Sequence, residues 1–418
     1  MIRTKKILIV ILVTAFLLRI IPALIFNYPV INDAVAYDDI GKNLASHFSY
    51  SRDGSTPSIE RPPGYPVFLA LLYFVFGHNV QVVIFIQVLL SVLSVYLLYL
   101  LAKIFLREIS ALFCALLAAI YPMFIYYNLF LYSENLAIFT CLLFLYTLFI
   151  GLKENNKFYI VISGFSFVIF MLTKPLFAPL LLLIFGLLFL YRKDFNLKYT
   201  ISLFFLPIVL VWGAWILRNN LVFQQPIPFG IGLGPVLFVG NHPNFNGVWP
   251  QDYGEINKLA PANGLSSVEY DNFLKAKAID QIKKEPTQTI RLFFVKLINY
   301  FSVVQDLSQS KIYKQGGGLS IVAFQLLFLF YKFYKVFISI LSIIGTVIIL
   351  WKLKKNKNFF QLFILMLIWY AALVHALIYV DERYHLPVFA LHLILSIYTL
   401  EYVYIFIIKN MNRNYLFK

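Results

Sequence analysis

The sequence NYPVINDAVAYDDIGKNLASHFSYSRDGSTPSIERPPGYP, residues 27–66, is a charged insert between an apolar N-terminal segment and a long series of further apolar segments. Its acids are Asp33, Asp38, Asp39, Asp53 and Glu60, and its bases are Lys42, Arg52 and Arg61. The chain as a whole is basic, with 35 Lys+Arg against 19 Asp+Glu. An acidic loop on a basic chain indicates a site rather than a tether, and we expect residues 27–66 to form half of a catalytic pocket.

The composition around this loop is that of a membrane protein. Of 418 residues, 61% are hydrophobic and 13% are charged, whereas soluble domains have about 45–50% apolar and about 25% charged residues. The mean hydropathy is +0.79. Many apolar runs reach the roughly 17–25 residues that cross a bilayer as a helix, and lipid offers backbone groups no other partners. The sequence therefore predicts an all-α polytopic membrane protein with residues 1–418 in a single domain.

The net charge of +16 does not indicate nucleic-acid binding. The basic residues concentrate in short turns between apolar runs, which is the positive-inside pattern. The two cysteines, Cys114 and Cys141, lie inside apolar segments and are expected to be packing residues. MIRTKK before the first apolar run predicts a cytoplasmic N-terminus and an uncleaved first span. Arg19, near the outer end of this span, is expected to extend to the membrane interface.

About ten spans, within a range of nine to twelve, follow from the apolar runs, with both termini in the cytoplasm. The expected segments are about 7–26, 80–105, 109–127, 133–152, 158–172, 176–191, 199–217, 319–351, 359–380 and 386–408. In the first outer loop, residues 32–48 predict a short helix and ERPPGYP an extended turn. Residues 65–76 are too short to span and predict a half-helix on the outer surface.

Residues 218–318 form the second large outer loop of this topology. A Gly- and Pro-rich stretch comes first, followed by an amphipathic helix near 267–285 with a capping box from Ser266 to Glu269. Residues 290–305 are apolar but short, which predicts an interfacial or re-entrant helix. The same topology places a set of ionisable residues on the outer face, several of them at the ends of spans, where such groups are functional candidates. They are Asp33, Glu60, Arg61, Lys174, Arg218, His242, Asp381 and Arg383.

These residues carry a resemblance to GT-C class glycosyltransferases that use polyprenyl-phosphate sugars, in particular the group of protein mannosyltransferases and lipid A aminoarabinose transferases. Asp33-Ala34-Val35-Ala36-Tyr37 resembles the family's acidic first-loop motif, and Glu60-Arg61-Pro62-Pro63-Gly64-Tyr65 resembles a second family element. Further positions with this resemblance are Ser133-Glu134, Thr173-Lys174-Pro175, Arg218-Asn219 and Arg383-Tyr384. The chain departs from the family pattern at Ala34, where a second acid is common, and at Lys174, where Arg is commoner.

The resemblance implies transfer of a sugar from a polyprenyl phosphate to an acceptor, with inversion at the anomeric carbon. An attacking hydroxyl needs a carboxylate within hydrogen-bond reach, and we expect Asp33 to be this general base. The leaving phosphate gains charge, so cations must receive it. Arg61, Lys174 and Arg383 are the expected phosphate ligands, with Arg218 as a fourth candidate. Tyr37, Tyr65, Glu134 and Tyr384 are expected to line or support the pocket.

Glu60 has two interpretations. Relatives in the aminoarabinose branch bind a metal near this position, so Glu60 and His242 are a candidate pair for a divalent ion. The alternative, which we favour, is an ion pair that orients Arg61, because one His and one acid far apart are a weak metal signature. Glu134 either binds hydroxyl groups of the sugar or acceptor, or complements a helix N-terminus.

Two other classes of protein share this composition. A transporter or flippase of lipid-linked sugars would keep polar residues near mid-membrane, and a surface-polysaccharide polymerase or ligase would use a lipid pyrophosphate donor. Because the charges collect on one face, we favour the transferase, with its site on the outer face of the cell membrane. The richness in Lys, Ile, Asn and Phe favours undecaprenyl over dolichyl phosphate as the lipid. The sequence leaves the sugar and the lipid, glycan or protein acceptor open.

Overall fold

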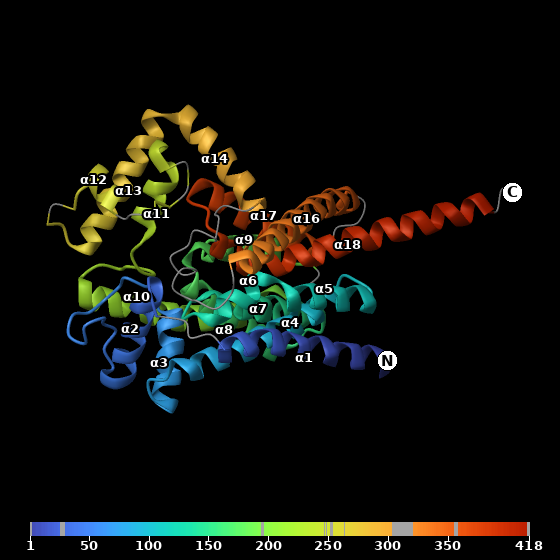
Figure 1. Ribbon diagram of the computed structural model, residues 1–418, viewed down its shortest axis with the longest axis horizontal. Coiled ribbons are helices and arrows are strands. Elements are labelled where there is room, and N and C mark those ends of the chain that lie inside the picture. Colours follow the sequence, from blue (N-terminus) through green and yellow to red (C-terminus); the bar gives the residue numbers. More distant parts are fainter. Residues whose placement is uncertain are drawn as a thin grey trace.

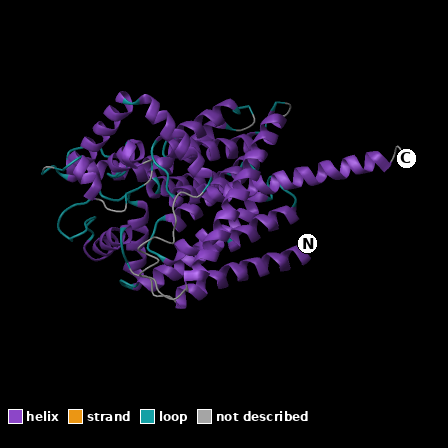
Figure 2. Cartoon of the chain, turned by 45° about the horizontal axis from the view of Figure 1, so that its top comes forward, coloured by secondary structure: helices purple, strands orange, loops and turns teal. Residues whose placement is uncertain are grey.

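The computed structural model describes residues 2–25, 30–193, 196–245, 247, 249–250, 254–262, 264–302, 321–354 and 358–415. The described chain is helical, with an isolated bridge between Ser51 and Pro57 as its one β-type pairing (Figure 2). The predicted all-α class is confirmed. Residues 27–29 of the first loop, 303–318 of the second loop and the start of the expected 319–351 segment lie outside the described residues.

Long apolar helices form the body of the molecule. Within the described residues, seven helices are long and apolar enough to cross a membrane, or eight if a bent pair counts as one span. The seven include α1 (Ile2–Ile25), α4 (Val80–Ala102), α7 (Glu134–Lys153), α10 (Leu197–Phe223), α16 (Ile321–Leu353), α17 (Phe359–Leu377) and α18 (Glu382–Tyr415). Two shorter apolar helices, α8 (Lys157–Thr173) and α9 (Leu180–Leu190), occupy the other two expected segments. The chain is a multi-pass membrane protein.

The bent pair is the main local difference from the expected spans. Residues 109–127 were predicted as one helix, but α5 (Glu108–Ile120) ends before Tyr121, and α6 (Pro122–Tyr126) and η1 (Tyr127–Leu129) follow at a bend of 54°. Pro122 is the first residue of α6, where its missing N–H costs no helical hydrogen bond. The same residue inside a continuous span would break the helix.

Both termini lie at one end of the bundle, and α2 (Asp33–His47) and α3 (Gly64–Phe76) lie together at the other end (Figure 1). The short helices predicted over 32–48 and 65–76 are thus present. The turn before α3 is shorter than expected, because Gly64, Tyr65 and Pro66 are already helical. A Cβ on Gly64 would lie 2.7 Å from Thr173 N, so glycine allows the start of α3 to approach the end of α8.

The described parts of residues 218–318, which were expected to form the second outer loop, fold into a group of helices at the same end as α2 (Figure 1). It contains α11 (Leu233–Asn241), η3 (Pro243–Phe245), α12 (Gly254–Leu259), α13 (Ser267–Lys284) and α14 (Pro286–Phe301). A small apolar core joins α11, η3, α12 and α13 around Phe238, Val239, Leu274 and Ala278. The capping box from Ser266 to Glu269 is present as predicted.

Lys296 attaches this group of helices to the bundle. Its buried ammonium donates to Asn241 Oδ1 at 3.1 Å and to the carbonyls of Leu377 and Ile378 at 3.2 and 3.3 Å. These carbonyls lie at the C-terminal end of α17, where cations are favoured. Burial lowers the pKa of Lys296 to about 7.

Arg19 contradicts the expectation of an interfacial side chain. It is fully buried, and its guanidinium donates to Ser91 Oγ at 2.8 Å and to the carbonyls of Ala15 and Ala119 at 2.9 and 2.8 Å. Ser91 on α4 and Ala119 on α5 supply two of these acceptors and Ala15 on α1 the third, so the side chain does not need to reach water. It joins α1 to the bundle.

A buried ion pair joins α16 to α18. Lys335 Nζ lies 2.7 Å from Glu382 Oε2, both side chains are almost fully buried, and Tyr331 also donates to this carboxylate. Replacing Lys335 with Met should therefore lower the free energy of unfolding by about 3–5 kcal/mol, the usual cost of removing one partner of a buried pair. The double variant Lys335→Met/Glu382→Leu should recover most of this loss. Thermal unfolding in detergent provides the measurement, and a single variant as stable as the wild type would contradict the assignment.

Candidate active site

Asp33 lies at the first position of α2, at the end of the bundle away from the termini. The preceding residue, Asn32, has φ 54°, a left-handed value that Asn tolerates better than most residues. This turn directs the chain into α2. The buried residues Ala34, Tyr37 and Ile40 then hold the helix against its neighbours, so the Asp33 side chain is fixed in place while remaining partly exposed.

Two arginines from distant parts of the chain hold the Asp33 carboxylate. Arg61 Nη2 donates to Oδ1 at 2.9 Å, and Arg383 Nη2 donates to Oδ2 at 2.7 Å, across 350 positions of sequence. Burial by itself would raise the pKa of Asp33, but the charges of Arg383 and Arg61 outweigh it and hold the pKa well below its usual value. The expected convergence of Asp33 with Arg61 and Arg383 is therefore present in the structure.

Lys174 and Glu134 form a second pair beside the first. Lys174 Nζ lies 2.8 Å from Glu134 Oε1, and Arg383 Nε lies 3.7 Å from the same oxygen. Burial lowers the pKa of Lys174, while the Glu134 carboxylate acts in the opposite direction. Glu134 is almost fully buried at the first turn of α7. Arg383 thus contacts both carboxylates and connects the two pairs.

The aromatic residues predicted to support the pocket surround these cations. The guanidinium of Arg61 lies 5.4 Å from the Tyr37 ring centroid, and the ammonium of Lys174 lies 5.6 Å from that of Tyr384. Tyr65 packs edge-on against Tyr37 at 5.0 Å and donates to Gln87 Oε1. Such contacts restrict the cations without neutralising them.

Arg218 does not contact the Asp33 and Glu134 carboxylates. Its Nη1 donates to the Ser58 carbonyl at 3.1 Å and to Asn219 Oδ1 at 2.9 Å, and its Nη2 donates to the Tyr50 carbonyl at 3.4 Å. The guanidinium also lies over the Tyr50 and Trp215 rings. In this structure Arg218 supports the backbone of the first loop, and its candidate role as a fourth phosphate ligand has no geometric support.

The metal hypothesis also lacks geometric support. Glu60 lies 3.0 Å from Arg52 and 3.6 Å from Arg61, as in the alternative interpretation. His242 accepts from the Asn244 N–H and packs against Phe238 and Phe245, and burial lowers its pKa. Among the described residues, no group of three or more His, Cys, Asp or Glu side chains could hold a metal ion. The Glu60–His242 pair does not fit a metal, and we assign no step to one.

Sequence reasoning missed two contributors next to the site. The Tyr132 ring lies under the Arg383 guanidinium, and the distance from its centroid to Arg383 Cζ is 5.1 Å. Glu382, adjacent to Arg383, is held by Lys335. A lysine within an apolar run was the available signal for Lys335, but nothing in the sequence names its partner 47 positions away.

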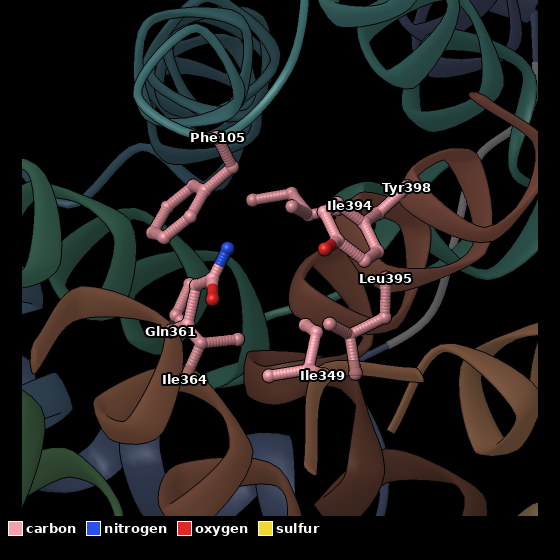
Figure 3. Close-up of a pocket in the computed structure, with 7 residues that line it drawn as sticks. All are labelled: Phe105, Ile349, Gln361, Ile364, Ile394, Leu395 and Tyr398. Atoms are coloured by element: carbon pink, nitrogen blue, oxygen red, sulfur yellow. The ribbon is translucent and has the colours of Figure 1, made fainter. Parts of the chain in front are cut away.

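The cavity shown in Figure 3 is a separate feature. It has a volume of about 10 Å³, which suffices for about one water molecule. Phe105, Gln361 and Tyr398 are among the residues around it. These residues lie outside the Asp33 cluster, and the cavity is too small for a substrate.

The fold places the chain among GT-C-like membrane proteins. The archaeal oligosaccharyltransferase of Archaeoglobus fulgidus in its apo form superposes with a TM-score of 0.57 at 15% sequence identity, over 99% of this chain and 52% of that chain. The AglB oligosaccharyltransferase of the same organism, in complex with an inhibitory peptide and a dolichol-phosphate, gives 0.53 at 14% identity, over 96% of this chain and 50% of that chain. The chain therefore spans about half the length of these relatives, and the likeness concerns the fold.

Part of the chain also matches a protein family. Residues 60–233 match the family of dolichyl-phosphate-mannose-protein mannosyltransferases, and the resemblance drawn from the motifs is confirmed. The matched stretch contains Glu60, Arg61, Glu134 and Lys174, whereas Asp33 and Arg383 lie outside it. ArnT from Cupriavidus metallidurans superposes with a TM-score of 0.43 at 14% identity, over 95% of this chain and 76% of that chain. No curated protein has significant sequence similarity to the chain.

Proposed function

We propose that this protein is an inverting glycosyltransferase that moves a sugar from a polyprenyl-phosphate donor to a lipid, glycan or protein acceptor on the outer face of the cell membrane. The observation that carries the proposal is the Asp33 carboxylate held between Arg61 and Arg383. The carboxylate suits the role of general base, and the two guanidinium groups suit the binding of the leaving phosphate.

The cations of the cluster support an anionic ligand. Arg61, Arg383 and Lys174 come together around the Asp33 and Glu134 carboxylates. Arginine matches the geometry of phosphate oxygens, so a phosphate can take the place of the Asp33 carboxylate on the two guanidinium groups. A solved protein of this fold is bound to dolichol-phosphate, which is in keeping with a lipid phosphate.

In the proposed reaction, each side chain of the cluster has a part. The donor phosphate replaces Asp33 as the partner of Arg61 and Arg383, and Lys174 adds a third contact. Released from the arginines, Asp33 accepts the proton of the acceptor hydroxyl as its oxygen attacks the anomeric carbon. The bond from that carbon to the phosphate oxygen breaks, and the three cations stabilise the charge of the departing polyprenyl phosphate.

Purified protein in proteoliposomes should consume an undecaprenyl-phosphate-linked sugar and release undecaprenyl phosphate, because the proposed donor carries one phosphate. We expect at least tenfold more release than from protein-free vesicles, measured by mass spectrometry of the lipids. Two results would contradict the proposal: cleavage of a pyrophosphate-linked donor alone, as expected of a polymerase or ligase, or movement of the intact donor across the bilayer without bond cleavage, as expected of a flippase.

A further inference from the structure

A second cavity, of about 300 Å³, lies next to the Asp33 cluster. Its walls come from the first loop, the end of α10, the segment before α11 and the start of α13. The residues that line it include Arg52, Thr56, Glu60, Phe223, Ile231 and Ser267. A volume of this size lies at the lower end of the range for small-molecule sites.

The first wall is a rigid hairpin, residues 50–58. Ser58 N donates to the Tyr50 carbonyl at 2.8 Å, and Asp53 Oδ1 accepts from the Ser55 and Thr56 N–H groups at 2.8 and 2.7 Å. Arg218 donates to the carbonyls at both ends of this hairpin. The wall is therefore formed before any ligand arrives, which lowers the entropic cost of binding.

The opposite wall is attached to the first by backbone contacts. Ile231 N donates to the Ile59 carbonyl at 3.0 Å. A Cβ on Gly230 would lie 2.7 Å from the same oxygen, so only glycine permits this approach. Phe223 and Ile231 give the cavity an apolar side, facing the polar hairpin.

A chain of charged contacts connects the cavity to Asp33. Arg52, fixed by Asp39 at 3.3 Å, lies 3.0 Å from Glu60 Oε2. Glu60 Oε1 in turn lies 3.6 Å from Arg61 Nη2, which donates to Asp33. A ligand in the cavity therefore lies two side chains away from the candidate base.

We propose that this cavity is the acceptor subsite and that the acceptor group it binds is a sugar ring. The inference rests on the proposed function and names the acceptor class that the function leaves open. A sugar ring has an apolar face, which suits Phe223 and Ile231, and a polar edge, which suits Arg52, Glu60 and Thr56. A lipid tail would cover the charged groups of Arg52 and Glu60 with hydrocarbon, and a volume of about 300 Å³ suits one sugar ring better than an extended peptide.

In the resulting step, the bound ring anchors the acceptor glycan, and a hydroxyl on the part of the glycan that extends past Glu60 and Arg61 to Asp33 loses its proton to that carboxylate. Its oxygen forms the new bond to the anomeric carbon of the donor sugar. The bond between that carbon and the phosphate oxygen breaks, and its electron pair leaves on the polyprenyl phosphate. The product is a glycan extended by one sugar.

The test separates transfer from hydrolysis. Proteoliposomes receive an undecaprenyl-phosphate sugar and either alkyl oligosaccharide glycosides or short peptides, and the ratio of sugar transferred to acceptor over sugar released to water is measured. We expect saturable transfer to a glycoside. Ser267→Trp, which fills the cavity from α13, should lower the ratio at least tenfold, and Thr56→Tyr, from the opposite wall, should lower it too. Asp280→Trp, on the exposed part of α13, is the matched control.

The outcomes are distinct. Ratios for Ser267→Trp and Thr56→Tyr equal to that of the control would overturn the acceptor subsite, as would saturable transfer to peptides and to no glycoside. If the wild type releases no sugar to water or to any acceptor, the proposed function itself fails. Release to water by either variant shows that the variant has folded.

Discussion

Replacing Asp33 with Asn should lower the rate of sugar transfer by about 10²–10⁴-fold, the usual contribution of a positioned general base. Asn keeps the shape of the side chain but cannot accept the proton of the acceptor hydroxyl. The measurement is the initial rate of transfer in proteoliposomes with saturating donor.

The matched control for this experiment is Asp280→Asn. Asp280 is an exposed acid on α13 that pairs with Lys284 at 2.8 Å and has no part in the Asp33 cluster. Its loss should leave the rate of transfer at the wild-type value. Transfer by Asp33→Asn within a few-fold of this control would remove Asp33 from the role of base.

Replacing Arg383 with Gln should lower transfer by about 10²–10³-fold, the cost of losing one preorganised donor to a developing negative charge. Arg383 is also the residue that contacts both Asp33 and Glu134. Arg383→Lys should retain part of the activity, because it keeps the charge and loses the planar fork. Arg291→Gln, an exposed arginine on α14, is the control that should behave as wild type.

The pH dependence of kcat/KM, which reports the enzyme before the donor displaces Asp33 from the arginines, gives this variant a second readout. In the wild type, Arg383 and Arg61 hold the pKa of Asp33 below its usual value, so the base stays ionised as the pH falls to the ordinary Asp pKa of about 4. Without Arg383 the pKa of Asp33 rises, and activity is lost as the pH falls through that higher value. An acid limb at the same pH in wild type and Arg383→Gln would show that Arg383 does not act on Asp33.

The helices were predictable because the bilayer fixes both their length and their apolar character. The segments expected near 80–105, 133–152 and 359–380 appear as α4, α7 and α17 with ends shifted by a few residues. The break at Tyr121–Pro122 was missed, since an apolar run of spanning length outweighed the proline signal. Apolar length alone cannot distinguish a straight span from a bent pair.

The convergence of Asp33 with Arg61 and Arg383 was predictable from topology, because positive-inside orientation puts all three at one end of the bundle. The pairing of Lys174 with Glu134 was not predictable. Nor was the burial of Arg19, since the sequence does not show which face of a span other helices cover. These details depend on how α1, α7 and α8 pack against one another, which a single sequence does not encode locally.

The most direct test of the central claim is the affinity of undecaprenyl phosphate for wild type and Asp33→Asn, measured in detergent by native mass spectrometry. The carboxylate and the phosphate compete for the same two guanidinium groups. The Asn variant should therefore bind the lipid phosphate as tightly as the wild type or more tightly, while its transfer activity is lost. Loss of lipid binding together with transfer would contradict the account, because Asp33 would then be needed to build the phosphate site rather than to act as its base.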